Sequence, residues 1–175
     1  DLPKPTQDSY ETKLNRTADI IVAMGTPTII GLQEVENLGI LEDLVALAQL
    51  SDYQYQPILI EGFDERGLDV AYLVRGDQAV IDGVTAYPAA DGSTIRPPLV
   101  LTTTVNLASG TETLYVLNNQ FTSLEAGEDA AESRRTAQAV WDVRLIQQIQ
   151  TSNPDAQIVI LGDFNSFYHT PPLDT

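Results

Sequence analysis

One stretch decides the fold of this chain: residues 158–167, with the sequence IVILGDFNSF. Its four branched apolar residues predict a strand that is buried on both faces, and Gly162 permits a sharp exit from that strand. Asp163 and Asn165 stand two positions apart, so both side chains can point to the same side of the strand end. A carboxylate and an amide placed in this way suit a divalent cation and a phosphate oxygen.

The same residues have a purely structural interpretation. Gly, Asp and Asn are common turn residues, so the sequence GDFN at 162–165 is also typical of a strand that simply enters a turn. A motif this short often occurs by chance. Both interpretations stay open until the rest of the chain is considered.

Composition limits the classes of protein to which this chain can belong. Its 175 residues, 43% of them hydrophobic, are enough for a real core, and we assign residues 1–175 to a single domain. The absence of cysteine excludes disulfides, thiolate metal sites and a cysteine nucleophile. The 25 acidic and 9 basic residues give a formal charge of −16, which repels polyanions. Such acidity favours an extracellular or cell-surface bacterial protein.

Hydrophobic periodicity predicts the elements along the chain. Helical spacing is found over residues 10–24, 37–48 and from 128 to about 150. A buried strand is expected at 27–32, and β-like runs follow at 53–60, 68–74, 79–87, 99–107 and 113–118. Connections with Gly, Asp or Pro predict hairpins at 61–62, 75–77 and 108–110. The pattern indicates an α/β (α+β) layered sandwich of mixed, mostly antiparallel sheets flanked by helices.

Six short motifs follow one another along the sequence. They are LQEVEN at 32–37, RGLDVA at 66–71, RPPL at 96–99, NNQFTS at 118–123, RR at 134–135 and GDFN at 162–165. Together they resemble the endonuclease/exonuclease/phosphatase superfamily over roughly residues 11–174. The resemblance implies two packed mixed sheets and a phosphoester hydrolase that uses Mg²⁺, or Mn²⁺ or Ca²⁺. Nucleic acid would be the commonest substrate of such a protein.

The resemblance also implies roles for single residues. Glu34 would be a metal ligand together with Asp163, and Asp163 with Asn165 would position the attacking water and the scissile phosphate. A bound metal would offset the charge that develops on the phosphoryl oxygens. An isolated glutamate at a strand end is more often a plain solvated residue. The order of the motifs is therefore what favours the metal site.

The segment that carries Asn118 and Gln120 departs from the family pattern. We expect both residues in the catalytic group, yet the nuclease and sphingomyelinase branches of the superfamily usually have His where Gln120 stands. A glutamine can donate a hydrogen bond to a phosphate but cannot carry a proton. The single histidine, His169, lies in a Pro-rich segment and is expected to be an exposed loop residue.

Four further polar residues have open interpretations. Asp69 could contact the substrate or be a buried structural carboxylate, and Arg96 could bind the substrate or belong to a turn beside two prolines. Arg134 and Arg135 begin a helix, whose N-terminus disfavours cations. We expect an acidic neighbour to pair with these two arginines, in preference to a phosphate.

Two segments of the superfamily pattern are not found. The first strand, with its Asn, would precede Asp1, and the closing Ser-Asp-His segment, with its general base, would follow Thr175. We therefore expect a fragment of the fold that hydrolyses phosphoesters poorly by itself. The rival hypotheses are a non-catalytic binding or scaffolding module of the same fold, and a phosphatase of small phosphoesters or lipid head groups.

Overall fold

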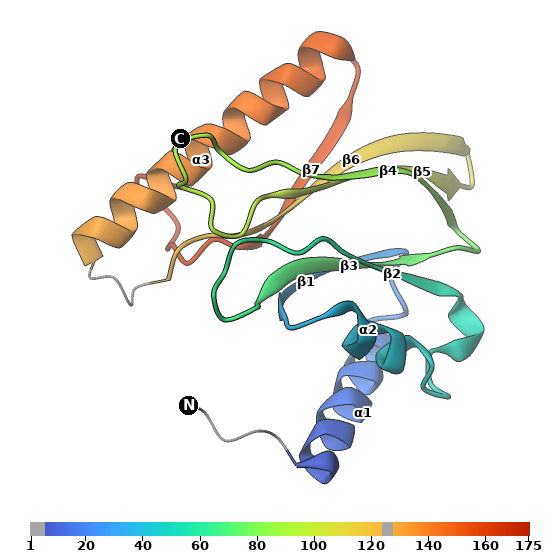
Figure 1. Cartoon of the computed structure of the whole chain (residues 1–175). Coiled ribbons are helices and arrows are strands. Elements are labelled where there is room, and N and C mark those ends of the chain that lie inside the picture. Colours follow the sequence, from blue (N-terminus) through green and yellow to red (C-terminus); the bar gives the residue numbers. More distant parts are fainter. Residues whose placement is uncertain (1–5, 124–127) are drawn as a thin grey trace.

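Two β-sheets lie face to face between helices in the computed structural model, which describes residues 6–123 and 128–175. The long helix α3 covers the outer face of one sheet, and α1 and α2 cover the outer face of the other (Figure 1). The described part of the chain contains no helix that is long and apolar enough to cross a membrane. The elements in chain order are α1 (Gln7–Ala23), β1 (Ile29–Val35), α2 (Leu38–Val45), the 3₁₀ helix η1 (Ser51–Tyr53), β2 (Tyr55–Leu59), β3 (Asp69–Arg75), β4 (Ala79–Ala86), β5 (Leu99–Leu107), β6 (Gly110–Gln120), α3 (Glu128–Ser152) and β7 (Gln157–Asp163).

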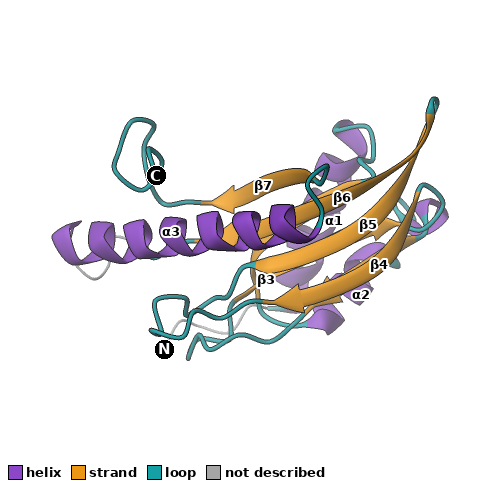
Figure 2. Ribbon diagram, turned by 90° about the horizontal axis from the view of Figure 1, so that it is seen from above, coloured by secondary structure: helices purple, strands orange, loops and turns teal. Residues whose placement is uncertain are grey.

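The sheets differ in how their strands connect. Sheet A has the order β1-β3-β2 and is antiparallel throughout. Sheet B has the order β4-β5-β6-β7, in which only β6 and β7 run parallel. A parallel pair needs a crossover, and α3 supplies it. Viewed from above, α3 lies over sheet B, and the chain leaves the end of β7 toward the C-terminus (Figure 2).

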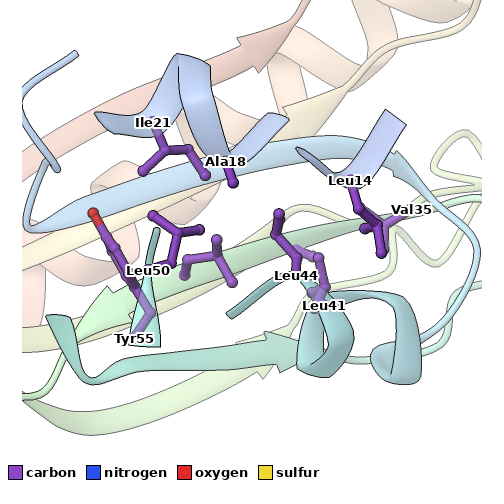
Figure 3. Packing of buried hydrophobic residues seen from close by; sticks show 10 residues of the cluster. Leu14, Ala18, Ile21, Val35, Leu41, Leu44, Leu50 and Tyr55 are labelled. Atoms are coloured by element: carbon purple, nitrogen blue, oxygen red, sulfur yellow. The ribbon is translucent and has the colours of Figure 1, made fainter. Parts of the chain in front are cut away.

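The apolar side chains form three layers of core. The first lies between α1, α2 and sheet A, where Leu14, Ala18 and Ile21 of α1 belong to one cluster with Leu41 and Leu44 of α2 (Figure 3). The second lies between the two sheets, and the third lies under α3. Each helix thus buries one stripe of its surface, as the predicted spacing requires. The layered α+β fold expected from the sequence is confirmed.

The helix ends follow from capping chemistry. The hydroxyl of Thr6 accepts a hydrogen bond from the Ser9 amide at the start of α1. Asn37 caps α2, as predicted, because its Oδ1 accepts a hydrogen bond of 3.1 Å from the Ile40 amide. Gly25 follows α1 with a φ of +82°, the left-handed conformation that favours glycine after a helix.

Two expectations about the strands are wrong. The turn at residues 75–77 is no hairpin, because β3 belongs to sheet A and β4 to sheet B. Its turn residues fit either geometry, and Arg75 instead pairs with Asp77 at 2.6 Å to hold the crossing between the sheets. The strand at 158–161 is not buried on both faces either. Val159 and Ile160 are 43% and 42% exposed, because β7 pairs with β6 alone within the described sheets.

One carboxyl group is buried in α3 without compensation. Asp142 is 4% exposed, and its Oδ1 has no hydrogen-bond partner. It borders an apolar cavity of about 200 Å³ with Phe121, Ile160 and Leu173. Burial raises the pKa of the Asp142 carboxyl to about 7. This group therefore makes the stability of the fold depend on pH.

Candidate active site

The candidate site residues converge because several strands end at the same edge of the molecule. Strand β1 runs antiparallel to β3, so Val35 at the end of β1 lies beside Asp69 at the start of β3. Strands β6 and β7 run parallel and end together at Gln120 and Asp163. The two sheets approach closely here, since a Cβ on Gly31 of β1 would overlap the side chain of Leu161 on β7. Distant parts of the sequence thus share one edge.

Glu34 owes its position to an irregularity in β1. The register of β1 against β3 shifts between Leu32 and Val35, which marks a β-bulge. Glu34 lies in this bulge with a φ of +58°, a conformation that non-glycine residues rarely adopt. The bulge leaves the side chain of Glu34 exposed, and its Oε1 accepts a hydrogen bond of 3.1 Å from Nε2 of Gln120. A strained backbone that aims a carboxylate is common in functional sites.

Gln120 lies at the edge of the molecule where the candidate site residues meet. It is buried at the end of β6, and its Oε1 has no hydrogen-bond partner. Residues directly opposite each other in neighbouring strands have side chains on the same face of the sheet, so Gln120 and Asp163 face the same way. Gln120 therefore neighbours both candidate metal ligands, Glu34 and Asp163.

Asn118 uses its amide group to join the two sheets. Its Nδ2 donates to the carbonyl oxygens of Leu32 at 3.1 Å and Ala71 at 2.9 Å, both in sheet A. Its Oδ1 accepts a hydrogen bond of 2.7 Å from Nε2 of Gln33. The side chain is fully buried and its donors and acceptor are engaged. In this arrangement Asn118 fixes β1, and with it Glu34, against β6.

Asp163 and Asn165 form a tight turn after β7. Asp163 is exposed, and its Oδ1 accepts a hydrogen bond of 2.9 Å from the Asn165 backbone amide. Nδ2 of Asn165 donates to the Phe121 carbonyl at 2.9 Å. Both the turn and the functional interpretation of this motif are thus compatible with the geometry, because the second Asp163 oxygen can still meet a ligand. Gly162, with a φ of +141°, lets β7 come so close to β6 that a Cβ would overlap the Asn119 backbone.

Asp69 supports a neighbouring loop. It is 3% exposed, and its Oδ1 accepts a hydrogen bond of 2.7 Å from the Gly62 amide. Burial raises the pKa of the Asp69 carboxyl, although the hydrogen bond from Gly62 opposes that shift. Asp69 thereby anchors the loop at residues 60–68, which borders the pocket beside the site.

A pocket of about 480 Å³ opens next to Gln120. Its walls come from the loop between β2 and β3, the loop between β4 and β5, the end of β6, and α3. Arg96 lies in one wall, where its Nε pairs with Oδ2 of Asp64 at 3.2 Å. Burial disfavours the ionised Asp64, but hydrogen bonds from Arg66 and the nearby charge of Arg96 lower the pKa of this carboxyl overall. The lining residues are Phe63, Asp64, Glu65, Arg66, Ile95, Arg96, Gln120, Thr122, Ser123, Arg134 and Gln138.

Arg134 and Arg135, near the start of α3, differ in their exposure. Arg134 is exposed and lines this pocket. Arg135 is 5% exposed and donates from Nη1 to the Thr122 carbonyl at 3.3 Å. Neither forms a salt bridge with a carboxylate among the side chains that the structure describes, 6–123 and 130–175, so the expected acidic partner stays a prediction. His169 is exposed, as predicted, and its side chain is 75% accessible.

Some lining residues were not anticipated from the sequence. Asp64 and Gln138 carry no motif, and they become neighbours only because a loop and a helix meet beside β6. Gln138 orders the pocket wall, since its Oε1 accepts from the Thr122 amide at 3.0 Å and its Nε2 donates to the Ser93 carbonyl at 3.0 Å. The scarcity of arginine in this acidic chain makes each arginine a candidate site residue. Only the fold shows that several of them line one pocket.

The donor set at the edge fits a hard divalent cation. Glu34, which accepts from Gln120, and Asp163, which stands opposite Gln120 in the strand register, are exposed carboxylates, and the Oε1 of Gln120 is buried and unpartnered. The described residues contain no group of three His, Cys, Asp or Glu side chains that could hold a metal. Mg²⁺ does not need one, because it commonly binds through one or two carboxylates and completes its shell with waters and substrate phosphate.

Comparison with known proteins agrees with this geometry. The model of the endonuclease/exonuclease/phosphatase family matches residues 3–172. The chain belongs to this family. Members of the endonuclease/exonuclease/phosphatase family are phosphoester hydrolases that typically use divalent metals. A search of curated protein sequences finds no match.

Solved structures share the fold of this family member at low sequence identity. Truncated TDP2 from Caenorhabditis elegans aligns with a TM-score of 0.68 at 20% identity, covering 93% of this chain and 58% of that chain. A mannosyl-6-phosphatase from Bacteroides thetaiotaomicron gives 0.72 at 15% identity, covering 95% and 61%. The human Nocturnin catalytic domain, with a bound sulfate anion, gives 0.64 at 16% identity, covering 94% and 60%. The chain thus spans less than two thirds of each of these structures.

Proposed function

We propose that this chain carries the metal-binding and phosphate-positioning half of a phosphoester hydrolase site, with Mg²⁺ or Mn²⁺ as the cofactor. The observation that supports this most directly is the hydrogen bond from Gln120 to Glu34, beside the strand pair that brings Asp163 to the same edge. Two carboxylates and an amide that three strands bring to one edge have little structural purpose there. They form a coherent set of oxygen ligands.

The residues divide into ligands and supports. Glu34 and Asp163 are the proposed metal ligands, and the bound metal supplies charge that stabilises the phosphoryl oxygens in the transition state. Gln120 orients Glu34 through its amide. Asn165 holds Asp163 in the turn through its backbone amide, so that the Asp163 carboxylate can orient an attacking water. Asn118 fixes β1 against β6 from behind.

The reaction class is clearer than the substrate. TDP2 from D. rerio has been solved with a single-strand DNA product, at 21% identity and a TM-score of 0.60, whereas the Bacteroides thetaiotaomicron relative is a mannosyl-6-phosphatase. Both nuclease and phosphatase activities are therefore candidates for this chain. A charge of −16 weakens binding to a nucleic-acid strand, so it favours a small phosphoester as the substrate.

Metal binding and hydrolysis should be tested together. Mg²⁺ and Mn²⁺ are titrated calorimetrically into the wild type and into the double variant Glu34→Gln with Asp163→Asn. A control double variant, Glu36→Gln with Asp155→Asn, removes two exposed carboxylates from other positions. Hydrolysis of p-nitrophenyl phosphate and bis-p-nitrophenyl phosphate is then followed in the same samples.

We expect saturable metal binding in the wild type and the control, and none in the site variant. Hydrolysis, however slow, should occur in the wild type and the control and be absent from the site variant. If all three proteins bind metal equally, Glu34 and Asp163 are no metal site. If metal binds but neither ester is hydrolysed, the non-catalytic module becomes the better description of this chain.

A further inference from the structure

A buried aspartate interrupts an apolar stripe of α3. The stripe faces the cavity of about 200 Å³ that borders β7, and it consists of Ala139, Asp142, Val143 and Ile146. These four residues recur at the spacing of one helix face. A stripe of this kind is normally apolar throughout, so a carboxyl group in the middle of it needs an explanation.

The Asp142 carboxyl has no partner within the described part of the chain. It is 4% exposed, its Oδ1 accepts no hydrogen bond, and none of the salt bridges among residues 6–123 and 130–175 includes it. Burial raises the pKa of this carboxyl to about 7. An ionised carboxylate without a partner in apolar surroundings is costly. A ligand that brings a cationic donor to Asp142 would offset that cost.

The walls of the cavity suit an apolar molecule better than water. Phe121 and Phe164 line it and contact each other edge to face, with ring centroids 5.2 Å apart. A buried water needs two to four polar partners, and Asp142 and Thr175 are the only described lining residues with polar side chains. Ile160 and Leu173, which also line the cavity, are 42% and 39% exposed, so a solute can enter from solvent.

The size of the cavity limits its occupant. An apolar cavity of roughly 150 Å³ holds a benzene molecule. A cavity of about 200 Å³ therefore has room for a six-carbon ring that carries one small head group.

The cavity also adjoins the turn that carries the proposed metal ligand. The backbone amide of Phe121 donates to the Asp163 carbonyl at 2.9 Å, and the Phe121 carbonyl accepts from Nδ2 of Asn165 at 2.9 Å. Phe164 lies between Asp163 and Asn165 in the sequence. A molecule that packs against the two phenylalanine rings thus touches the segment that positions Asp163.

We propose that this cavity is a binding site for a small molecule with an apolar body and one ammonium group, which pairs with Asp142. An ammonium group has three donors and no acceptor, whereas an ionised carboxylate only accepts. The formal charge of −16 also attracts cations to this protein. The apolar body buries its surface against Phe121, Phe164 and Ile146. Binding of this molecule requires neither a metal nor hydrolysis.

A ligand titration followed by NMR tests the proposal. Methyl signals of isoleucine report on the site directly, because Ile146 and Ile160 line the cavity and the other isoleucines do not. Three probes are added without metal at about pH 8: cyclohexylamine, which is protonated as lysine is, its neutral analogue cyclohexanol, and ethylamine, which has the charge but little apolar body. The proteins are the wild type, Asp142→Asn, Ala139→Leu and the control Asp155→Asn, which changes an exposed carboxylate after α3.

We expect cyclohexylamine to shift the methyl signals of Ile146 and Ile160 saturably in the wild type. Its affinity should exceed that of cyclohexanol about 10-fold, as one charge-assisted contact allows. Asp142→Asn should bind the amine and the alcohol equally. Ala139→Leu should weaken both, because the larger side chain occupies the cavity, and Asp155→Asn should behave as the wild type does.

Several results would overturn the proposal. Equal affinity for cyclohexylamine and cyclohexanol in the wild type, or an unchanged preference in Asp142→Asn, would show that Asp142 does not bind the ammonium group. Ethylamine that binds as tightly as cyclohexylamine, or amine binding without shifts at Ile146 and Ile160, would indicate cations on the acidic surface only. If Ala139→Leu is too unstable to fold, Asp142→Asn decides, since that substitution adds no bulk to the cavity.

Discussion

The side-chain amide of Gln120 donates a hydrogen bond of 3.1 Å to the carboxylate of Glu34, a residue 86 positions earlier in the chain. The same glutamine stands opposite Asp163 in the parallel pair of β6 and β7. One neutral side chain therefore orients the Glu34 carboxylate of sheet A from a position opposite Asp163 in sheet B. Its removal should affect ligand binding at this edge more than it affects the fold.

The first prediction concerns Gln120→Ala. Without its amide, Glu34 loses the contact that orients it, and Mg²⁺ affinity should fall about 10-fold, as is usual when a partner of a metal ligand is removed. A calorimetric titration measures this change. Gln150→Ala, an exposed glutamine of α3, is the control and should bind Mg²⁺ as the wild type does. An unaltered affinity in Gln120→Ala would show that this bond does not prepare the site.

The second prediction concerns the tie between the sheets. Asn118→Ala removes three hydrogen bonds to Gln33, Leu32 and Ala71. At roughly 1 kcal/mol each, their loss should lower the free energy of unfolding by about 3 kcal/mol. Urea denaturation measures it, with Asn106→Ala as an exposed control expected to change stability by less than about 0.5 kcal/mol. A small effect in Asn118→Ala would mean that water or a rearranged neighbour replaces these contacts.

The third prediction compares two glycines. Gly162→Ala would place a Cβ against the Asn119 backbone at a φ of +141°, so we expect a loss of at least about 1–3 kcal/mol in the free energy of unfolding. Gly83→Ala, in β4, meets no atom within 4 Å and should be nearly neutral. Thermal and urea denaturation of the two variants provide the comparison. Similar stabilities would refute the close approach of β7 to β6.

The fourth prediction concerns pH. Burial raises the pKa of Asp142 from 3.8 to about 7 in the folded protein, so the native state binds this proton more tightly than the unfolded state does. The stability that the protonated carboxyl supplies is complete below about pH 4 and is lost as the pH rises through about 7, by about 4 kcal/mol at most.

Asp142→Asn should remove this dependence, because the amide stays neutral. The difference in unfolding free energy between Asp142→Asn and the wild type should therefore grow in favour of the variant from about pH 4 to about pH 7. Urea denaturation at a series of pH values measures it. Asp155→Asn, an exposed aspartate after α3, should follow the wild type throughout. A constant difference across this range would contradict a buried, titrating Asp142.

Local patterns predicted most of the elements because their causes are local. The range 99–107 was found as the strand β5 because its apolar residues and its flanking turns lie within the segment itself. The Asn37 cap and the long helix before residue 150 follow from equally short signals. The family motifs located Glu34, Gln120 and Asp163 in one region, and the strand ends bring them to one edge.

The failures involve partners that are distant in the sequence. A turn with Gly and Asp at 75–77 can reverse a strand within a sheet or carry it to the other sheet, and only the packing of β3 between β1 and β2 decides. The apolar run at 158–161 has the residues of a central strand, but its burial depends on which strands lie beside it. The pocket with Arg134 combines two loops and a helix, and no local pattern in any one of them predicts it.

The edge position of β7 has a consequence for how the site would fail. Within the described residues this strand is held to its sheet by β6 alone, and it ends at Asp163. Strands of this kind open at a lower free energy than the core between sheets. Asp163 should then leave the site in fluctuations that leave Glu34 and Gln120 in place. A ligand that both carboxylates hold would suppress those openings and slow amide hydrogen exchange along β7 more than along β3.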